Sequence, residues 1–398
     1  MGPPIRDPSA PAPSRSDRAM MSCRLCRESL HAAPRLTVDP APSGAQHFAP
    51  TPDAARARSI ALVIAECPAC GLVQSLSPPV DGYRRAITAA GVSAPMRDHR
   101  LAQAHRLAAL VPPNRRAGAR LVLVGCGNGY ELSILADAGF APEGVESGGA
   151  PAGYDGRWTI HDAYPASART LPGAPYDALA CYNFLEHADD PRGFLSAIAA
   201  SLAADGVGIV EVPNYARQRA ESRAADYVAD HLSYFDAHTL RAMLTAGSFE
   251  VASVAEVRGG ENLEALVRRR PESTLPRDAD ALAAAQGTVR AFFELWHARG
   301  APAVAWGASH QALTLFSGAP PGAQPRLIID SAPFKHGTFA PATGIPVVAP
   351  TGEAVAGAGA VLVVAAGYEP EIVRGLRDSL AFHGELWTVR GHELVRLD

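Results

Sequence analysis

Residues 121–146, which read LVLVGCGNGYELSILADAGFAPEGVE, decide the fold of the central part of this chain. The apolar run 121–124 predicts a strand buried on both faces, and the glycine-rich GCGNG that follows must end it. From Tyr130 the apolar residues recur at helical spacing, and Gly139 is typical of a helix C-terminus. Gly144-Val145-Glu146 then predicts the end of a second strand that carries an acid. This strand, loop, helix and strand indicate an α/β fold.

The three loop glycines, Gly125, Gly127 and Gly129, would let a ligand approach the backbone. Glu146 follows the first of them by about 20 residues, a spacing that suits hydrogen bonds to the hydroxyls of a ribose. The pattern G-x-G-x-G differs from the G-x-G-x-x-G of dinucleotide-binding folds. It resembles the cofactor loop of class I S-adenosylmethionine (SAM) methyltransferases. The alternative is an ordinary tight turn between a strand and a helix in another α/β protein.

The composition narrows the class of protein. A chain of 398 residues is too long for one ordinary core, so we expect two or three domains. Residues 1–21 are rich in Pro, Ser and Ala and predict a disordered tail. Neither an apolar run of membrane-spanning length nor a secretory signal pattern is present, which predicts a cytoplasmic protein without a membrane partner. The net charge of −4 argues against a nucleic-acid partner, because binding phosphates requires clustered cations.

Two C-x-x-C pairs, Cys23 with Cys26 and Cys67 with Cys70, predict a zinc site. Four thiolates satisfy a tetrahedral Zn²⁺ and leave no open position for water, so we expect the metal to be structural. It would hold together a small lobe, residues 22–80, that has little core of its own. The alternative is a redox motif or two unrelated pairs of thiols.

Polar residues follow the expected strands of the central domain. Asp162 ends the third strand, a usual place for an adenine contact, while Asn183 ends the fourth strand at 176–183 and His187 follows it. Ligands of open α/β sheets bind beyond the carboxyl ends of the strands. We therefore expect Asn183 and His187 near the methyl donor and its acceptor.

His231 follows the fifth strand, at 206–214, and Asp230 directly before it would orient the imidazole or raise its basicity. The alternative is a surface histidine in a loop. Tyr83, near the end of the cysteine lobe, either faces the active site or is an amphipathic tyrosine at a lobe boundary.

The C-terminal part predicts a second parallel sheet. Residues 259–300 are expected to be a linker and a helix, and residues 301–398 alternate strands with helices. The turn after the first expected strand of this part has only Gly307 of the glycines that a phosphate-binding loop requires. This argues against a dinucleotide site there. Lys335 is the only lysine of the chain.

Together these residues resemble the sugar C-methyltransferases, SAM-dependent enzymes that add a branching methyl group to nucleotide-linked 4-keto-6-deoxyhexoses. The resemblance runs from Cys23 to the end of the chain. Its most specific parts are residues 67–74, the H-x-S-Y-F segment 231–235, and the C-terminal blocks 307–309, 330–337 and 344–346. It implies a zinc-binding N-terminal lobe (22–80), a central class I SAM methyltransferase domain of Rossmann-like fold (81–258) and a second Rossmann-like α/β domain (301–398).

The resemblance also implies roles for single residues. His231 corresponds to the catalytic base of the family, with Asp230 in place of a glutamate, and His187 to a second active-site histidine. Tyr83 corresponds to a tyrosine of the N-terminal lobe. The chain departs from the family at Val228, where a tyrosine is expected and where Tyr227 is one position away.

The resemblance therefore implies base-catalysed enolate formation and methyl transfer to carbon in a nucleotide-linked keto-deoxysugar, with SAM and a structural Zn²⁺ as cofactors. The expected partner is a small molecule, and the expected assembly is a monomer or a homodimer. One rival is an O- or N-methyltransferase of another small metabolite. Another is a catalytically silent scaffold that binds zinc and SAM.

Overall fold

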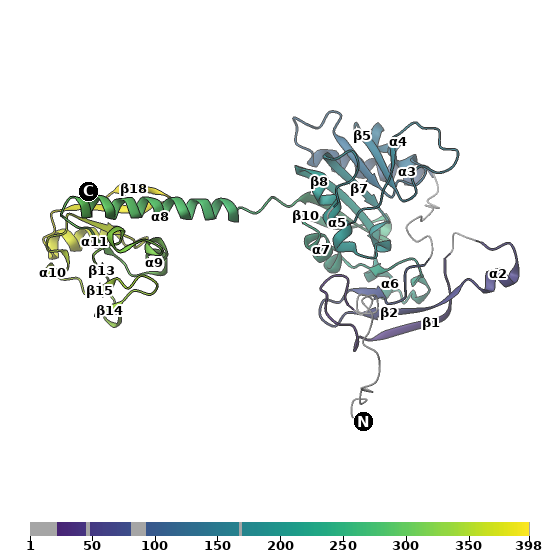
Figure 1. Cartoon of the computed structure of the whole chain (residues 1–398). Coiled ribbons are helices and arrows are strands. Elements are labelled where there is room, and N and C mark those ends of the chain that lie inside the picture. Colours follow the sequence, from purple (N-terminus) through teal and green to yellow (C-terminus); the bar gives the residue numbers. More distant parts are fainter. Residues whose placement is uncertain (1–21, 45–47, 81–92, 167–168, 398) are drawn as a thin grey trace, which may run out of the picture. The chain divides into compact units, whose positions relative to one another are not determined.

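The computed structural model describes residues 22–44, 48–80, 93–166 and 169–397 (Figure 1). The chain divides into two compact units, Met1–Glu272 and Ser273–Asp398. The tail at 1–21 and Tyr83 lie outside the described residues, so the expectations for them stay predictions. No helix in the described ranges combines the length and the apolarity that crossing a bilayer requires.

A seven-stranded sheet forms the centre of the first unit. In spatial order its strands are β10 (Phe249–Val257), β11 (Asn262–Arg269), β8 (Leu202–Pro213), β7 (Tyr176–Tyr182), β4 (Arg120–Val124), β5 (Ala141–Glu146) and β6 (Ile160–Asp162). Strands β4 to β8 run parallel, and β11 and then β10 are added antiparallel at one edge. The α/β architecture expected from the glycine-rich unit is confirmed.

Helices cover both faces of this sheet: α3 (Ala94–Leu110) and α4 (Tyr130–Asp137) on one, α5 (Pro191–Ala200) and α7 (Ala237–Ala246) on the other. Alternate residues of a strand point to opposite faces. Leu121 and Leu123 therefore pack with α3 and α4, while Val122 and Val124 pack with α5 and α7. All four side chains are buried, as the continuous apolar run predicts.

The N-terminal lobe is built on a four-stranded antiparallel sheet of β1 (Arg35–Pro42), β2 (Ser59–Glu66), β3 (Val73–Ser75) and β9 (Ser233–Tyr234). A short helix, α2 (Pro52–Arg56), lies between β1 and β2. Strand β9 comes from beyond β8 in the sequence, yet its Ser233 pairs with Gln74 of β3. The lobe is thus joined by sheet hydrogen bonds to the segment that carries His231.

The second unit holds another seven-stranded sheet. Its strands, in spatial order, are β14 (Thr338–Phe339), β15 (Pro346–Val348), β13 (Ile328–Ile329), β12 (Val304–Trp306), β16 (Ala360–Val363), β17 (Glu385–Arg390) and β18 (Glu393–Arg396). Strands β15, β13, β12, β16 and β17 are parallel, as the sequence predicts. The helices are α8 (Leu275–Ala298), α9 (His310–Phe316), α10 (Gly352–Val355) and α11 (Glu369–Arg374).

The segment expected as linker and helix, 259–300, is divided differently in the structure. Its first part is β11, which pairs with both β8 and β10 and so belongs to the central sheet. The expected boundary at 258 falls inside the β10–β11 hairpin, at a turn where Gly259 and Gly260 have positive φ. The helix α8 begins at Leu275, and Val289, Phe293 and Trp296 place it in the core of the second unit.

Candidate active site

The glycine-rich loop between β4 and α4 is tightly folded. Gly125, Gly127 and Gly129 have φ values of 74°, 52° and 78°, a region that favours glycine. A Cβ atom at Gly125 would lie 2.3 Å from Cδ2 of Phe184, so no other residue fits without displacing that ring. The Gly127 N–H donates a 2.8 Å hydrogen bond to Oε2 of Glu146.

Acidic side chains stand at the ends of two neighbouring strands. Glu146 ends β5 and also accepts a 3.2 Å hydrogen bond from the Ser147 N–H. Burial raises the pKa of Glu146, and these backbone donors oppose the rise in part. Asp162 ends β6, opposite Glu146 in the sheet, and accepts a 2.8 Å hydrogen bond from the Gly148 N–H. Carboxylate oxygens beside a glycine-rich loop at the ends of parallel strands are acceptors of the kind that ribose hydroxyls require.

His187 and His231 lie together. His187 is in a 3₁₀ turn, Leu185–His187, and its Nδ1 lies 2.8 Å from the Asp230 carbonyl oxygen. A carbonyl only accepts, so Nδ1 carries the proton and Nε2 is left without one in the neutral ring. The two imidazole rings meet edge to face, with centroids 4.9 Å apart. The two predicted histidines and Asp230 are therefore brought into one cluster.

Both imidazoles are neutral near pH 7. Burial lowers the pKa of His231 to about 4, the nearby His187 adds to the decrease, and Asp230 opposes it. Burial also lowers the pKa of His187, again against the charge of Asp230. A neutral imidazole is the form that accepts a proton.

Glu186 joins this cluster, although the sequence analysis did not select it. The side chain of Glu186 is 2% exposed and its Oε1 lies 3.9 Å from Nε2 of His187, while its Oε2 has no hydrogen-bond partner among the described residues. Burial raises the pKa of Glu186 to about 8. The ligand atoms of Glu186, His187 and His231 lie within 4.8 Å of one another, close enough to share a metal ion.

A pocket of about 660 Å³ opens beside His231. Asp230, Val228 and His231 line it, whereas His187 and Tyr227 do not. The Tyr227 hydroxyl instead lies 3.2 Å from that of Tyr215. Further polar residues of the lining come from two stretches of the chain, 214–218 and 258–262: Asn214, Tyr215, Gln218, Arg258, Glu261 and Asn262.

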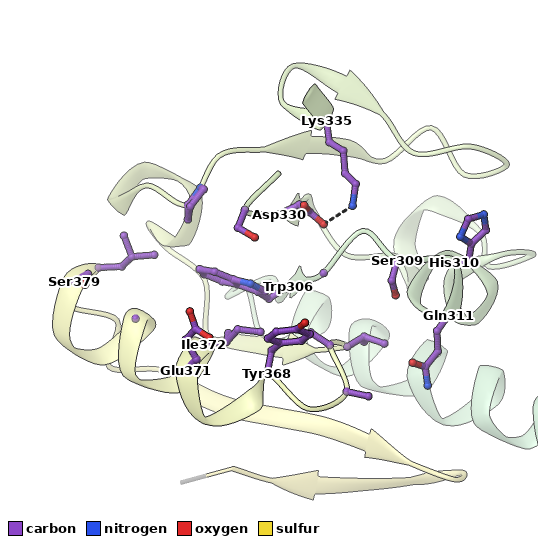
Figure 2. Close-up of a pocket in the computed structure, with 18 residues that line it drawn as sticks. Trp306, Ser309, His310, Gln311, Asp330, Lys335, Tyr368, Glu371, Ile372 and Ser379 are labelled. Atoms are coloured by element: carbon purple, nitrogen blue, oxygen red, sulfur yellow. Dashed lines mark hydrogen bonds and ion pairs between the residues drawn. The ribbon is translucent and has the colours of Figure 1, made fainter. Parts of the chain in front are cut away.

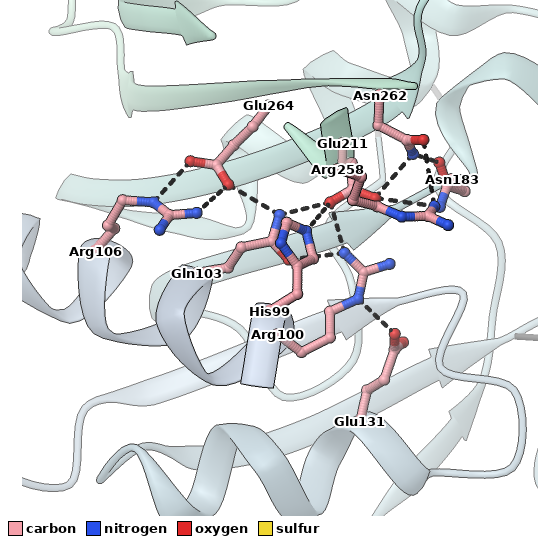
Figure 3. Close-up of polar contacts among 10 residues, drawn as sticks. All are labelled: His99, Arg100, Gln103, Arg106, Glu131, Asn183, Glu211, Arg258, Asn262 and Glu264. Atoms are coloured by element: carbon pink, nitrogen blue, oxygen red, sulfur yellow. Dashed lines mark hydrogen bonds and ion pairs between the residues drawn. The ribbon is translucent and has the colours of Figure 1, made fainter. Parts of the chain in front are cut away.

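A polar network, which was not predicted, adjoins this pocket through Arg258 and Asn262 (Figure 3). Glu211 of β8 is 0% exposed and accepts hydrogen bonds from Arg100 (2.6 Å), Gln103 (2.5 Å) and Asn262 (2.9 Å). Although burial alone would raise it, hydrogen bonds from His99 and the charge of Arg100 lower the pKa of Glu211 to about 2.

The same network reaches Asn183, the residue predicted near the cofactor. Asn262 Nδ2 donates to Oδ1 of Asn183 over 2.7 Å, and Asn183 has a φ of 47° at the end of β7. Glu264 of β11 extends the network outwards, because Gln103 and Arg106 both donate to its carboxylate. The sequence has polar residues at 99, 100, 103 and 106, which is helical spacing. This spacing could have predicted that one face of α3 is polar.

The predicted cysteines also converge. Sγ of Cys23 lies 3.5 Å from that of Cys70, Sγ of Cys26 lies 3.6 Å from that of Cys67, and all four lie within 4.8 Å of one another. Thiolates around a tetrahedral zinc with 2.3 Å bonds are about 3.8 Å apart. The cluster is compatible with a zinc-binding lobe.

The second unit contains a larger pocket, of about 900 Å³, at the carboxyl ends of β12, β13 and β16 (Figure 2). Trp306, Asp330 and Tyr368 face into it. Lys335, the only lysine of the sequence, donates to Oδ2 of Asp330 (2.9 Å) and to the Ala308 carbonyl (3.0 Å). Its charge is therefore largely compensated by Asp330.

Two family models match the chain. Residues 96–254 match a methyltransferase domain, and residues 250–389 match a C-methyltransferase C-terminal domain. No curated protein matches the sequence.

Several solved structures are similar at low identity. A chain from the complex of the Haloferax volcanii Trm112 methyltransferase activator with a methyltransferase is 18% identical, with a TM-score of 0.37, and the match covers 48% of this chain and 99% of that one. The 1,6-didemethyltoxoflavin-N1-methyltransferase of Burkholderia thailandensis is 16% identical, with a TM-score of 0.34 and coverages of 53% and 96%. An amino pentose methyltransferase from Micromonospora echinaspora is 20% identical, with a TM-score of 0.33 and coverages of 48% and 98%.

Three observations indicate the same class of protein: the glycine-rich loop with Glu146, the strand order of the central sheet, and the matches to the two family models. The chain is a methyltransferase in which a methyltransferase domain is followed by a C-methyltransferase C-terminal domain.

Proposed function

We propose that this methyltransferase transfers a methyl group to the carbon next to a ketone in a nucleotide-linked keto-deoxysugar, with His231 as the base. The observation that carries the proposal is the placement of His231. It lines the pocket beside Asp230, it is neutral near pH 7, and His187 packs against its ring. The match of residues 250–389 to a C-methyltransferase C-terminal domain supports carbon as the acceptor.

Glu146, Asp162 and Asn183 would hold the cofactor together with the glycines at 125, 127 and 129. SAM, when bound, supplies an electrophilic methyl group on a sulfonium centre. Each carboxylate oxygen has two lone pairs, so Glu146 could accept hydrogen bonds from the ribose hydroxyls beside the two that its oxygens accept from the backbone N–H groups of Gly127 and Ser147. The three loop glycines, all at positive φ, carry no side chain that would block the approach of a ligand to the backbone.

In the reaction, His231 would take the proton from the carbon next to the ketone. The low pKa of the free imidazole keeps it unprotonated, and an enolate formed beside it would raise its affinity for the proton. Asp230 would stabilise the resulting imidazolium, since its charge already opposes the decrease in the His231 pKa. Donors on the pocket wall, among them Arg258 and Tyr215, would stabilise the enolate oxygen.

The cysteine cluster would hold a structural zinc. All four sulfur atoms are engaged in the cluster, and three of the cysteines are at least partly buried. A closed set of four thiolates leaves no position for a reacting water, so the metal would contribute to folding of the lobe and not to the chemistry.

The test is a screen of nucleotide-linked 4-keto sugars with SAM, read by mass spectrometry for the gain of one methyl group. With a substrate deuterated next to the ketone, methyl transfer to that carbon must release one deuteron to the base, because the methyl group takes its place. Methyl transfer that keeps every deuteron on this carbon would instead support an O- or N-methyltransferase. SAM binding without methyl transfer to any sugar would support a silent scaffold and contradict the proposal.

A further inference from the structure

Arg24 lies between the first two cysteines of the cluster, and its side chain reaches the candidate active site. Its Nη1 donates to the carbonyl of Leu232 over 3.2 Å, and its Nε donates to the carbonyl of Asp189 over 3.3 Å. Leu232 directly follows His231, and Asp189 lies two residues after His187. One guanidinium therefore contacts the loops of both histidines.

The same side chain is fastened within the lobe. Nη1 of Arg24 donates to the Ser75 carbonyl over 2.7 Å, and the Arg24 N–H donates to Oε1 of Gln74 over 3.0 Å. Gln74 and Ser75 belong to β3, which follows the second cysteine pair. Arg24 is thus held between both halves of the cysteine cluster and cannot swing away without breaking these contacts.

The two histidine loops are also tied to each other and to β3. The Ser75 N–H donates to the Leu232 carbonyl over 3.1 Å, and the Leu232 N–H donates to the Glu186 carbonyl over 2.8 Å. The Leu232 carbonyl thus receives two donors from the lobe, and its N–H is bound to the residue before His187. A displacement of β3 or Arg24 would be passed directly to His231.

We propose that Arg24 is a positioning residue, which fixes the loops of His187 and His231 to the cysteine cluster. The catalytic meaning of this contact rests on the proposed function, in which His231 is the base. A guanidinium suits the task because its donors form a rigid fork that can reach several carbonyls at once, whereas a lysine offers one compact ammonium. The cysteine lobe would then set the geometry of the reaction as well as its own fold.

Arg27 provides a matched control within the same cysteine loop. Its Nη2 pairs with Oδ1 of Asp190 over 2.9 Å, but the two side chains are 52% and 50% exposed. Exposed ion pairs of this kind contribute little. Arg27→Gln removes the same charge from the same loop without touching the carbonyls beside the histidines.

The experiment compares Arg24→Gln, Arg24→Lys and Arg27→Gln with the unchanged full-length protein. Three measurements can be made without an acceptor substrate: metal content, SAM affinity, and hydrogen–deuterium exchange of peptides covering 184–189 and 227–236. With an acceptor, kcat and KM are measured separately. For Arg24→Gln we expect unchanged metal and SAM affinity within about twofold, faster exchange in both peptides, and kcat lowered about 100-fold, the scale of a misplaced reacting group. Arg24→Lys should be intermediate, and Arg27→Gln should match the unchanged protein.

Unchanged exchange of both peptides in Arg24→Gln would overturn the proposal, as would faster exchange with unchanged kcat. If Arg24→Gln loses its metal or fails to fold, the test rests on Arg24→Lys. A folded, metal-bound Arg24→Lys protein with the same exchange and the same kcat as the unchanged protein would show that the guanidinium fork is not needed, and would overturn the proposal. A failure of the proposed function can be distinguished from a failure of the Arg24 proposal. In the first case no keto sugar is methylated by any variant, while the exchange data still decide whether Arg24 holds the loops.

Discussion

The side chains of Glu211 and Asn262 share a 2.9 Å hydrogen bond across the neighbouring strands β8 and β11. This bond orients the Asn262 amide, which also donates to Asn183 and accepts from Arg258 over 3.3 Å. Asn183 is a proposed cofactor contact, and Arg258 lines the pocket beside His231. One buried carboxylate therefore fixes side chains on the cofactor side and on the acceptor side.

Glu211→Gln should destabilise the protein by about 3–5 kcal/mol, the usual cost of removing one partner of a buried ion pair. Arg100, which is 3% exposed, would keep only Glu131 as a carboxylate partner. Equilibrium unfolding in urea at pH 7 measures the loss. Asp137→Asn is the control, because Asp137 pairs with Arg97 at an exposed position and should change stability by less than about 1 kcal/mol. A Glu211→Gln variant as stable as this control would contradict the assignment.

The pH dependence of the same pair follows from the low pKa of Glu211. A carboxyl whose folded-state pKa is about 2, against about 4.3 when unfolded, stabilises the fold fully above the unfolded value and loses this contribution as pH falls towards 2. Between these values the unchanged protein should lose stability with falling pH, and Glu211→Gln should lose less. Equal slopes for both proteins would show that Glu211 is not the titrating group.

The pKa of Glu186 is raised, whereas that of Glu211 is lowered, and Glu186→Gln tests this increase. With its pKa raised by burial to about 8, Glu186 is mostly protonated at pH 7, so a glutamine of nearly the same shape should change stability little there. The folded state binds the extra proton between about 4.3 and about 8, so the unchanged protein should lose stability as pH rises through this interval. The variant should show a smaller decrease, measured as the midpoint of thermal unfolding at pH 6 and pH 8.

The sequence was sufficient to predict the central sheet, the cysteine cluster and the histidine pair. These features depend on local patterns, such as the apolar run at 121–124 or the spacing of Cys23 and Cys26, and on strand ends that a parallel sheet brings together. It did not predict Arg24 or Glu211. Their partners lie about 50 to 200 residues away in the chain, and a single charged residue carries no local signal of being buried.

Glu146→Ala should weaken SAM binding by about 1.5–3 kcal/mol, or roughly 10- to 150-fold, the scale of a hydrogen bond to a charged group. Isothermal titration calorimetry measures it. Glu143→Gln is the control from the same strand, because Glu143 contacts Arg120 (2.7 Å) and His161 (2.8 Å) and not the glycine loop. Unchanged SAM affinity in Glu146→Ala would mean that the ribose is bound elsewhere.

Cys67→Ser should lower the metal content below one equivalent per chain and destabilise the N-terminal lobe, because a structural zinc contributes its binding free energy to folding. Inductively coupled plasma mass spectrometry gives the metal content. Cys181→Ala is the control, since Cys181 is a buried thiol of β7 outside the cluster and should leave the metal in place. A stable, active and metal-free Cys67→Ser protein would remove the zinc assignment.

His231→Ala should keep SAM affinity but lower both methyl transfer and exchange of the proton next to the ketone by about 10²–10⁴-fold, the usual contribution of a general base. His187→Ala should be less severe, because His187 does not line the pocket and is bound to the Asp230 carbonyl. For the unchanged enzyme, kcat/KM should decrease with acid near the His231 pKa of about 4 and not near 6.5. Exchange at the native rate in His231→Ala would place the base on another residue. If His187→Ala were then the inactive variant, Nε2 of His187, which carries no proton in the neutral ring, would be the base.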